Sequence, residues 1–189
     1  ELEALASAGA LRALEGHRHQ ARWAVAGVEK PGGLFASMDR FEATPLLRKP
    51  TEGQNIVADY KNIGLTLERH PMDLVLHRLD RYRYVQAERL RDMTTGQDIS
   101  VAGLVITKQR PGTASGVTFV TLEDETGHIN LVVWKHVAEQ DRAALLNARL
   151  LGVRGELQIE TNVIHVIARK LIDHTPMLGD LEVKSRDFR

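Results

Sequence analysis

The sequence contains no cysteine at any of its 189 positions, which excludes disulfide bonds and thiolate metal sites. No run of apolar residues approaches the length of about 20 that a membrane-spanning helix needs, and no secretory signal opens the chain. We therefore expect a cytoplasmic protein without a membrane partner. The first residue is Glu1 and the opening reads as the middle of a motif, so we expect a piece of a longer polypeptide.

An excess of charge is also missing. Lys and Arg together number 25, Asp and Glu together number 25, and the formal net charge is zero. The two signs nearly balance within residues 97–173 as well. A site for nucleic acid would therefore depend on the local placement of Lys and Arg side chains and not on a basic domain.

Catalytic patterns are absent from this stretch. The consecutive carboxylates Glu123, Asp124 and Glu125 alternate faces in a strand, so they cannot converge on one metal ion and indicate a charged turn. The eight histidines show no His-x-x-x-His spacing, and no P-loop, GxGxxG or GxSxG motif occurs. We expect no catalytic residues, no metal site and no cofactor within these residues.

The periodicity of apolar residues divides the chain into a helical part and a strand-rich part, which predicts an α+β protein. Helical patterns stop at Pro and Gly, and the strand-like period of two begins near Gln97. The predicted segments are helices at 1–28, a linker or strap at 29–54, a helical connector at 55–96, a β-domain at 97–173 and a polar tail at 174–189. In the connector, His70 is expected to cap the helix that Pro71 opens.

Three strands, a helix and two more strands follow one another in the β-domain. This order is typical of a five-stranded OB-fold barrel. The strands are expected at Ile99–Thr107, Val117–Leu122, His128–Trp134, Leu150–Ile159 and Val163–Leu171, with the helix at Val137–Leu146.

OB-folds bind single strands across their second and third strands, through aromatic stacking and basic residues in the flanking loops. If Val120 faces the core, its neighbours on the second strand face outward, and the same alternation applies to the third strand. The predicted nucleic-acid-binding residues are Lys108, Arg110, Phe119, Thr121, Asn130 and Trp134. The alternative is that Phe119 and Trp134 only pack against neighbouring helices.

The opening residues predict a helix, a glycine turn and a second helix. A helix-hairpin-helix of this kind presents backbone N–H groups to a phosphate of duplex DNA. The residues predicted to contact the duplex backbone are Gly9, Ala10, Arg12 and Arg18. A purely structural helical hairpin fits the same residues equally well.

Taken in order, several segments resemble the DnaE-type DNA polymerases of bacteria, and the error-prone paralogue more than the main replicase. The N-terminal helices and the segment that joins them to the barrel are similar to that family. Within the barrel and at the end of the chain, the similarity rests on three segments, RPGTA at 110–114, LEDETG at 122–127 and SRDF at 185–188. The resemblance covers nearly the whole chain.

The resemblance implies the C-terminal region of an error-prone polymerase that extends primers across damaged DNA, in translesion repair synthesis during the SOS response. The parent enzyme would be a DNA-directed DNA polymerase, and its Mg²⁺-binding carboxylates would lie outside this chain. The hairpin would hold duplex DNA by its backbone, and the OB barrel would contact the single-stranded template.

One departure from the replicase concerns the sliding clamp. The replicase has a glutamine-led clamp motif between the hairpin and the OB domain, whereas this chain has Leu34 and Phe35 without a preceding glutamine. A degenerate clamp contact at Leu34 and Phe35 remains an option, but the missing glutamine disfavours direct clamp binding. It favours recruitment through accessory mutagenesis proteins.

Two other functions remain open. One is a docking module for accessory mutagenesis proteins without DNA contact, which the balanced charge of the β-domain favours. The β-domain also has the turn found in anticodon-binding barrels of tRNA-binding enzymes, but the helices that precede the barrel argue against that function.

Overall fold

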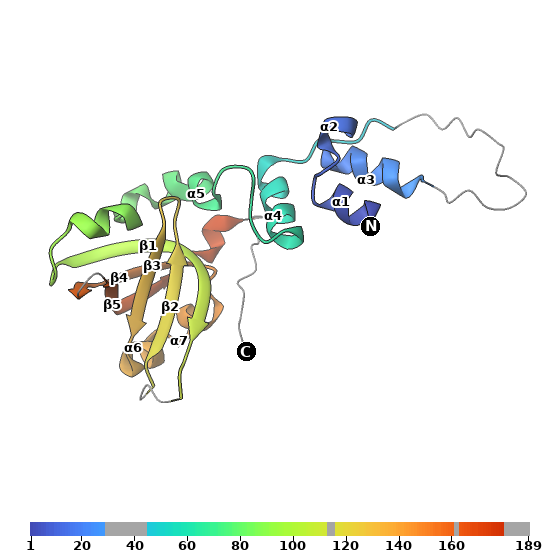
Figure 1. The fold of residues 1–189 in the computed structure, drawn as a ribbon. Coiled ribbons are helices and arrows are strands. Elements are labelled where there is room, and N and C mark those ends of the chain that lie inside the picture. The colour runs from blue at the N-terminus through green and yellow to red at the C-terminus, as the bar shows by residue number, and fades with distance from the viewer. Residues whose placement is uncertain (29–44, 113–115, 161–162, 180–189) are drawn as a thin grey trace, which may run out of the picture. The chain divides into compact units, whose positions relative to one another are not determined.

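The structure is a computed structural model that describes residues 1–28, 45–112, 116–160 and 163–179. The chain divides into two compact units, Glu1–Glu68 and Arg69–Arg189. The division falls inside the 55–96 stretch that the sequence predicts as one connector. Figure 1 shows the helices of the first unit in blue to cyan and the barrel of the second in green to red.

Helices are the only regular secondary structure among the described residues of the first unit. Its helices are α1 (Leu2–Ser7), α2 (Arg12–Glu15), α3 (Arg18–Ala26) and α4 (Glu52–Asn62). A capping box starts α4, because the Thr51 hydroxyl accepts from the Gln54 N–H and the Gln54 side chain accepts from the Thr51 N–H. With the start of α4 fixed in this way, Asn55 and Asp59 lie four residues apart on one helix face.

A buried ion pair joins these helices. Arg18 on α3 and Asp59 on α4 are 4% and 1% exposed and pair directly. The Arg18 guanidinium also donates to the Asn55 carbonyl at 2.9 Å. The second Asp59 oxygen accepts from the Thr66 hydroxyl at 3.2 Å. These additional hydrogen bonds offset the cost of removing two charges from water, so the pair fixes how α3 and α4 pack.

The second unit begins with α5 (Pro71–Leu79), and the cap expected at His70 is confirmed. His70 Nδ1 accepts from the Met72 N–H at 3.2 Å, and Pro71 occupies the first helical position. Met72, Val75 and Leu79 are buried at the spacing of one helix face. The 3₁₀ helices η1 (Asp80–Tyr82) and η2 (Ala87–Asp92) follow, within the stretch predicted as the helical connector.

Five strands form a closed barrel in the order β1-β2-β3-β5-β4, which confirms the predicted OB-fold. The β3–β5 pair is parallel and the other pairs are antiparallel. The strands are β1 (Asp98–Gln109), β2 (Thr118–Glu123), β3 (His128–Val133), β4 (Leu150–Glu160) and β5 (Val163–Asp173). The inward side chains of all five strands form one apolar core, which includes Val101, Val105, Val120, Leu122, Ile129, Leu131, Val133, Val153, Leu157, Val166 and Leu171.

The helix expected between the third and fourth strands is divided in two. Helix α6 (Lys135–Gln140) ends at Asp141, and α7 (Arg142–Asn147) begins directly after it. The Asp141 carboxylate accepts from the Leu171 N–H of β5 at 2.8 Å. This bond ties the break to the barrel, while Val137 and Leu145 bury one side chain from each helix in the core.

The beginning of the predicted polar tail is packed onto the barrel, which corrects the expected boundary at 174. The 3₁₀ helix η3 (Thr175–Leu178) buries Leu178, and His174 is 2% exposed. His174 Nε2 lies 2.6 Å from the Tyr84 hydroxyl. Burial raises the pKa of Tyr84 to about 12 and lowers the pKa of His174, so a neutral phenol and a neutral imidazole share this hydrogen bond at pH 7. A Cβ at Gly152 would lie 2.3 Å from the Tyr84 oxygen, which explains the glycine there.

We predict that Asp59→Asn destabilises the first unit by roughly 3–5 kcal/mol, because it leaves the Arg18 charge buried without its partner. Trp23 lies in the first unit and Trp134 in the second, so urea unfolding followed by tryptophan fluorescence in a Trp134→Phe background reports on the first unit alone.

The matched control for this prediction is Glu68→Gln. It breaks the more exposed Arg12–Glu68 pair, whose atoms lie 2.9 Å apart, and should cost less than about 1 kcal/mol. Equal losses in the two variants would contradict the structural role given to Asp59.

The attachment of η3 should weaken in acid. The folded state disfavours protonated His174, since its pKa is lowered by burial, against the raising effect of Asp173. The stability that it contributes is therefore complete above the ordinary pKa of about 6.5 and is lost as the pH falls through the lower, folded-state pKa. Hydrogen-exchange protection factors at the His174 and Met177 amides should fall between pH 7 and pH 5. This dependence should flatten in His174→Gln and persist in the exposed-site control His136→Gln.

Candidate nucleic-acid interface

The outer surface of β2 and β3 carries the residues that the alternation predicts. Val120 and Leu122 are buried in the core, so Phe119 and Thr121 point away from it, and Phe119 is 40% exposed. Thr121 is paired with Asn130 across the two strands, and its hydroxyl lies 3.4 Å from the Asn130 oxygen. We call the surface formed by Phe119, Thr121, Asn130 and Val132 the β2–β3 face.

Trp134 lies just beyond this face. It follows the last residue of β3 and occupies the N-cap position of α6, where its carbonyl accepts from the Ala138 N–H. Its side chain is 48% exposed. The last paired residue of β3 is Val133, so the strand alternation does not extend to Trp134.

The two predicted cations are separated in function. The Lys108 ammonium donates to the carbonyls of Leu146 and Ala148, at 3.0 and 3.3 Å, and so satisfies the C-terminal end of α7. Arg110, two residues further on, is exposed. The prediction that Lys108 serves the binding surface is therefore corrected to a structural role, and Arg110 remains available for a ligand.

A β-bulge is the physical reason for this difference. The register between β1 and β2 shifts between Val105 and Thr107, which reverses the face of every residue that follows on β1. Lys108 is consequently paired with the core residue Val120, and Gln109 is paired with Phe119. Gln109 thus extends the β2–β3 face, and the sequence reasoning missed it because no pattern in β1 marks the bulge.

The face also extends onto β5. Asn130 is paired with His165, and Val132 with Ile167, through the parallel β3–β5 pairing. Within the described residues, the Nδ1 atom of His165 is buried without a hydrogen-bond partner. The sequence analysis missed His165 because a parallel pairing between segments 35 residues apart leaves no local signal.

Asp124 lies in the turn between β2 and β3, where the sequence predicts a charged turn, and its carboxylate organises that turn. One carboxylate oxygen accepts from the N–H groups of Thr126 and Gly127 at 2.7 and 2.8 Å. The other accepts from the Ala87 N–H of η2 at 2.6 Å. Glu125 adds a bond from the Gln86 side chain at 2.6 Å. The turn therefore holds η2 against the end of the barrel.

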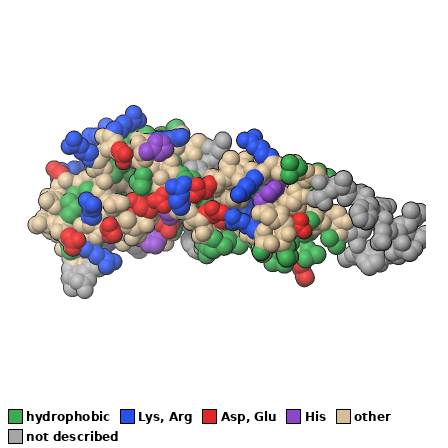
Figure 2. All heavy atoms as spheres, turned by 90° about the horizontal axis from the view of Figure 1, so that it is seen from above, with side chains coloured by type: hydrophobic (Ala, Val, Ile, Leu, Met, Phe, Trp, Pro, Cys, Tyr) green, Lys and Arg blue, Asp and Glu red, His purple; other side chains and the backbone are tan. Residues whose placement is uncertain are grey.

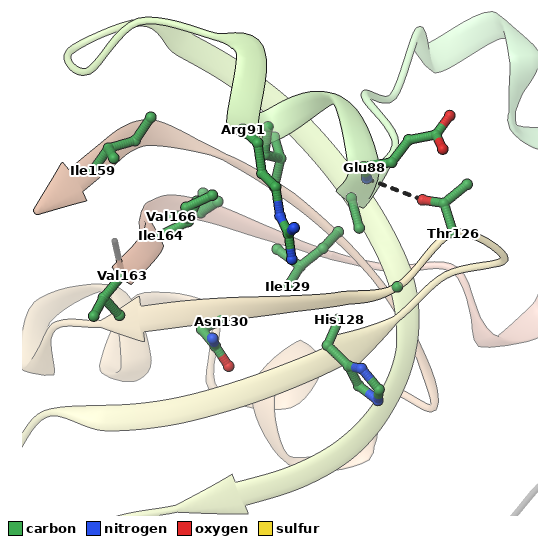
Figure 3. A pocket seen from close by; sticks show the side chains of 13 residues that line it. Glu88, Arg91, Thr126, His128, Ile129, Asn130, Ile159, Val163, Ile164 and Val166 are labelled. Carbon is green, nitrogen blue, oxygen red and sulfur yellow. Dashed lines mark hydrogen bonds between the residues drawn. The ribbon is translucent and has the colours of Figure 1, made fainter. Parts of the chain in front are cut away.

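A cavity of about 820 Å³ lies between η2, the β2–β3 turn, β3 and β5 (Figure 3). Its residues are Ala87, Glu88, Leu90, Arg91, Thr126, Gly127, His128, Ile129, Asn130, Ile159, Val163, Ile164 and Val166. Asn130 belongs both to this lining and to the β2–β3 face. The cavity is therefore continuous with the predicted binding surface.

The residues predicted to contact duplex DNA have other partners in the first unit. Arg18 is buried against Asp59, so it offers no charge to a phosphate, which corrects that prediction. Arg12 pairs with Glu68. Gly9 has a φ of +81°, and a Cβ there would lie 2.9 Å from the Arg18 guanidinium, so the glycine turn before Ala10 makes room for a buried arginine. Leu34 and Phe35 lie outside the described residues.

No three His, Asp or Glu side chains converge as a metal-ligating group in the part of the chain that the structure describes. No helix among the described residues is both long and apolar enough to cross a membrane. Lys and Arg side chains are interspersed with Asp and Glu on the surface seen in Figure 2.

Residues 99–173 match the family described as OB-fold nucleic acid binding domain, tRNA_anti-codon. The matched residues are those of the barrel, which agrees with its OB-fold topology. Among solved structures, asparaginyl-tRNA synthetase from Pyrococcus horikoshii aligns with 48% of this chain and 22% of that chain, at 25% identity and a TM-score of 0.41. A likeness at that score carries no further argument.

Curated relatives extend the comparison beyond the barrel. A protein named error-prone DNA polymerase from Methylococcus capsulatus is 52% identical over all 189 residues, which are 100% of this chain and 18% of the relative. One of the same name from Pseudomonas syringae pv. tomato is 50% identical over 187 residues, 99% of this chain and 18% of the relative. The chain matches the C-terminal region of proteins named error-prone DNA polymerase, which confirms the resemblance found in the sequence.

The different roles of the two cations can be tested by stability. Lys108→Met should lower the free energy of unfolding of the second unit by about 1 kcal/mol or more, because two carbonyls lose a charged donor. Arg110→Met removes the same charge from an exposed position and should change stability by less than about 0.5 kcal/mol. Urea unfolding followed by Trp134 fluorescence, in a Trp23→Phe background, compares the two. A larger loss in Arg110→Met would contradict the assigned roles.

Proposed function

We propose that this chain is a strand-binding region of an error-prone DNA polymerase, and that its β2–β3 face contacts the single-stranded template. The observation that carries the proposal is the half-exposed Phe119 ring on the outer surface of β2, next to the polar pair Thr121 and Asn130. An OB-fold uses this surface for single strands, because an exposed aromatic ring can stack on any base.

The side chains of the β2–β3 face suit a single strand that is bound mainly through base stacking and less through charge. Gln109, Thr121 and Asn130 provide hydrogen-bonding groups beside Phe119, and Arg110 follows directly at the end of β1. At the other end of the strands, Glu123 is paired with His128, with their side chains 4.0 Å apart. Few phosphates would be neutralised by such a surface, so we expect a shallow dependence of affinity on salt.

The wider function of the parent protein belongs to the same proposal. It would be a DNA-directed DNA polymerase that uses Mg²⁺ held by carboxylates elsewhere in its chain. It would act in SOS-induced translesion synthesis, with accessory mutagenesis proteins as partners for its recruitment. The relatives' shared name supports the polymerase activity, while the burial of Arg18 removes one of the contacts expected from a helix-hairpin-helix on duplex DNA.

The test is the anisotropy of a labelled single-stranded oligonucleotide titrated with the chain at low and moderate salt. Phe119→Ala should weaken binding roughly five-fold or more, since a stacked base contributes about 1–3 kcal/mol. Arg110→Met should weaken binding and reduce the slope against salt, as expected when one phosphate contact is lost.

Lys108→Met is the matched control, because it removes the same charge from a side chain that is bound to the end of α7. It should leave the affinity within about two-fold once folding is verified by circular dichroism. If the wild-type chain binds no strand at low salt, the β2–β3 face is not a strand site. The docking of accessory proteins then becomes the better hypothesis.

A further inference from the structure

The cavity beside the β2–β3 face has two walls of different chemistry. One wall is apolar and branched, with Ile159 at the end of β4 and Val163 and Ile164 at the start of β5. The polar groups come from the opposite wall, from Arg91 of η2 and from the turn at Thr126 and Gly127. A ligand that satisfies both walls has an apolar surface and polar or anionic groups on the same molecule.

Arg91 supplies the cation of the polar wall. Its side chain extends from η2 into the cavity toward Ile129, whereas the Glu88 carboxylate points away (Figure 3). Arg91 is exposed and forms no ion pair with a carboxylate among residues 1–28, 45–112, 116–160 and 163–179. A guanidinium in this position can receive a phosphate through a bidentate contact or can stack on the face of a base.

The size and the position of the cavity indicate what kind of ligand it can hold. Its volume of about 820 Å³ falls within the range of small-molecule sites, roughly 300–1,000 Å³. Asn130 lies at the junction, because it lines the cavity and also pairs with Thr121 on the β2–β3 face. A strand that crosses this face therefore passes the mouth of the cavity.

We propose that the cavity binds one unstacked nucleotide of the single-stranded DNA, with the base against Ile159, Val163 and Ile164 and a phosphate on Arg91. This inference rests on the proposed strand-binding function and adds a second kind of contact to it. The β2–β3 face would stack on bases along the strand, whereas the cavity would hold one base that has left the stack. Unstacking costs a few kcal/mol, so the pocket should favour positions where the base is already unpaired or damaged.

The experiment places 2-aminopurine at successive positions of a single-stranded oligonucleotide and titrates each with the full 189-residue chain. Emission should rise strongly at one position, because 2-aminopurine is quenched by stacking on its neighbours. Arg91→Ala and Val163→Trp should abolish this rise. Val163 is 49% exposed, so a larger side chain can fill the mouth of the cavity without entering the barrel core.

Arg89→Ala is the matched control, since Arg89 is an exposed arginine of the same 3₁₀ helix and does not line the cavity. It should keep the position-specific rise, with any loss of overall affinity equal to that of Arg91→Ala or smaller. Phe119→Ala should weaken strand binding while keeping the rise at saturating protein. The pocket would be overturned if the position-specific rise is kept in both arginine variants or lost in both, or if it survives Val163→Trp.

A second titration separates failure of the pocket from failure of strand binding. It uses 2′-deoxyadenosine 5′-monophosphate and is followed by amide chemical shifts. The Thr126, Gly127 and Ile129 amides should shift in the wild-type chain and in Arg89→Ala, and not in Arg91→Ala. Unmoved amides in the wild-type chain overturn the pocket even if the oligonucleotide binds. Shifts without any oligonucleotide binding support a nucleotide pocket and contradict the proposed strand face.

Discussion

The arrangement of the candidate site depends on the hydrogen bonds of the buried Asp124 carboxylate. Asp124 accepts from backbone N–H groups of its own turn and from the Ala87 N–H at the start of η2. It thereby fixes two segments that are far apart in the sequence, and between them lies the cavity that Arg91 enters. Hydrogen bonds to a buried charge are among the stronger ones, at about 1.5–3 kcal/mol each. A charged residue in a turn therefore has a structural role here, because its carboxylate accepts from three backbone N–H groups and from the Thr126 hydroxyl.

Much of the barrel could be predicted because the alternation of buried and exposed residues is local information. The alternation predicts the strands β2 and β3 from their inward residues Val120, Leu122, Ile129 and Leu131. The same alternation predicts that Phe119 and Asn130 point outward. The orientation of Lys108 could not be predicted in this way, because a single extra residue in β1 reverses the alternation after Val105. A bulge is set by the pairing of two strands, and neither strand's own sequence records it.

The glycine turn of the first unit shows a different limit of sequence reasoning. The pattern correctly predicts helices on both sides of Gly9. It leaves two explanations for the glycine turn open, contact with DNA and a purely structural reversal of the chain. The structure adds a third reason, since the space without a Cβ is taken by the guanidinium of Arg18. Arg18 is one of the least exposed charged residues of the chain, and only its long-range partner Asp59, 41 residues away, explains why. From the sequence alone, an arginine near a glycine turn fits a phosphate contact and a buried ion pair equally well. Only its acidic partner decides between the two.

The balance of charge constrains how the second unit can hold a strand. A basic groove binds through counterion release and loses affinity steeply with salt. The described face instead combines one exposed aromatic ring, polar side chains on neighbouring strands and isolated arginines at its two ends, Arg110 and Arg91. Under the proposed function, such a surface would gain affinity by stacking on unpaired, accessible bases. Duplex DNA, whose bases are already stacked and paired, would gain little from it. The β2–β3 face would then favour single-stranded over duplex DNA through stacking. A strongly basic surface would attract both forms and would discriminate less between them.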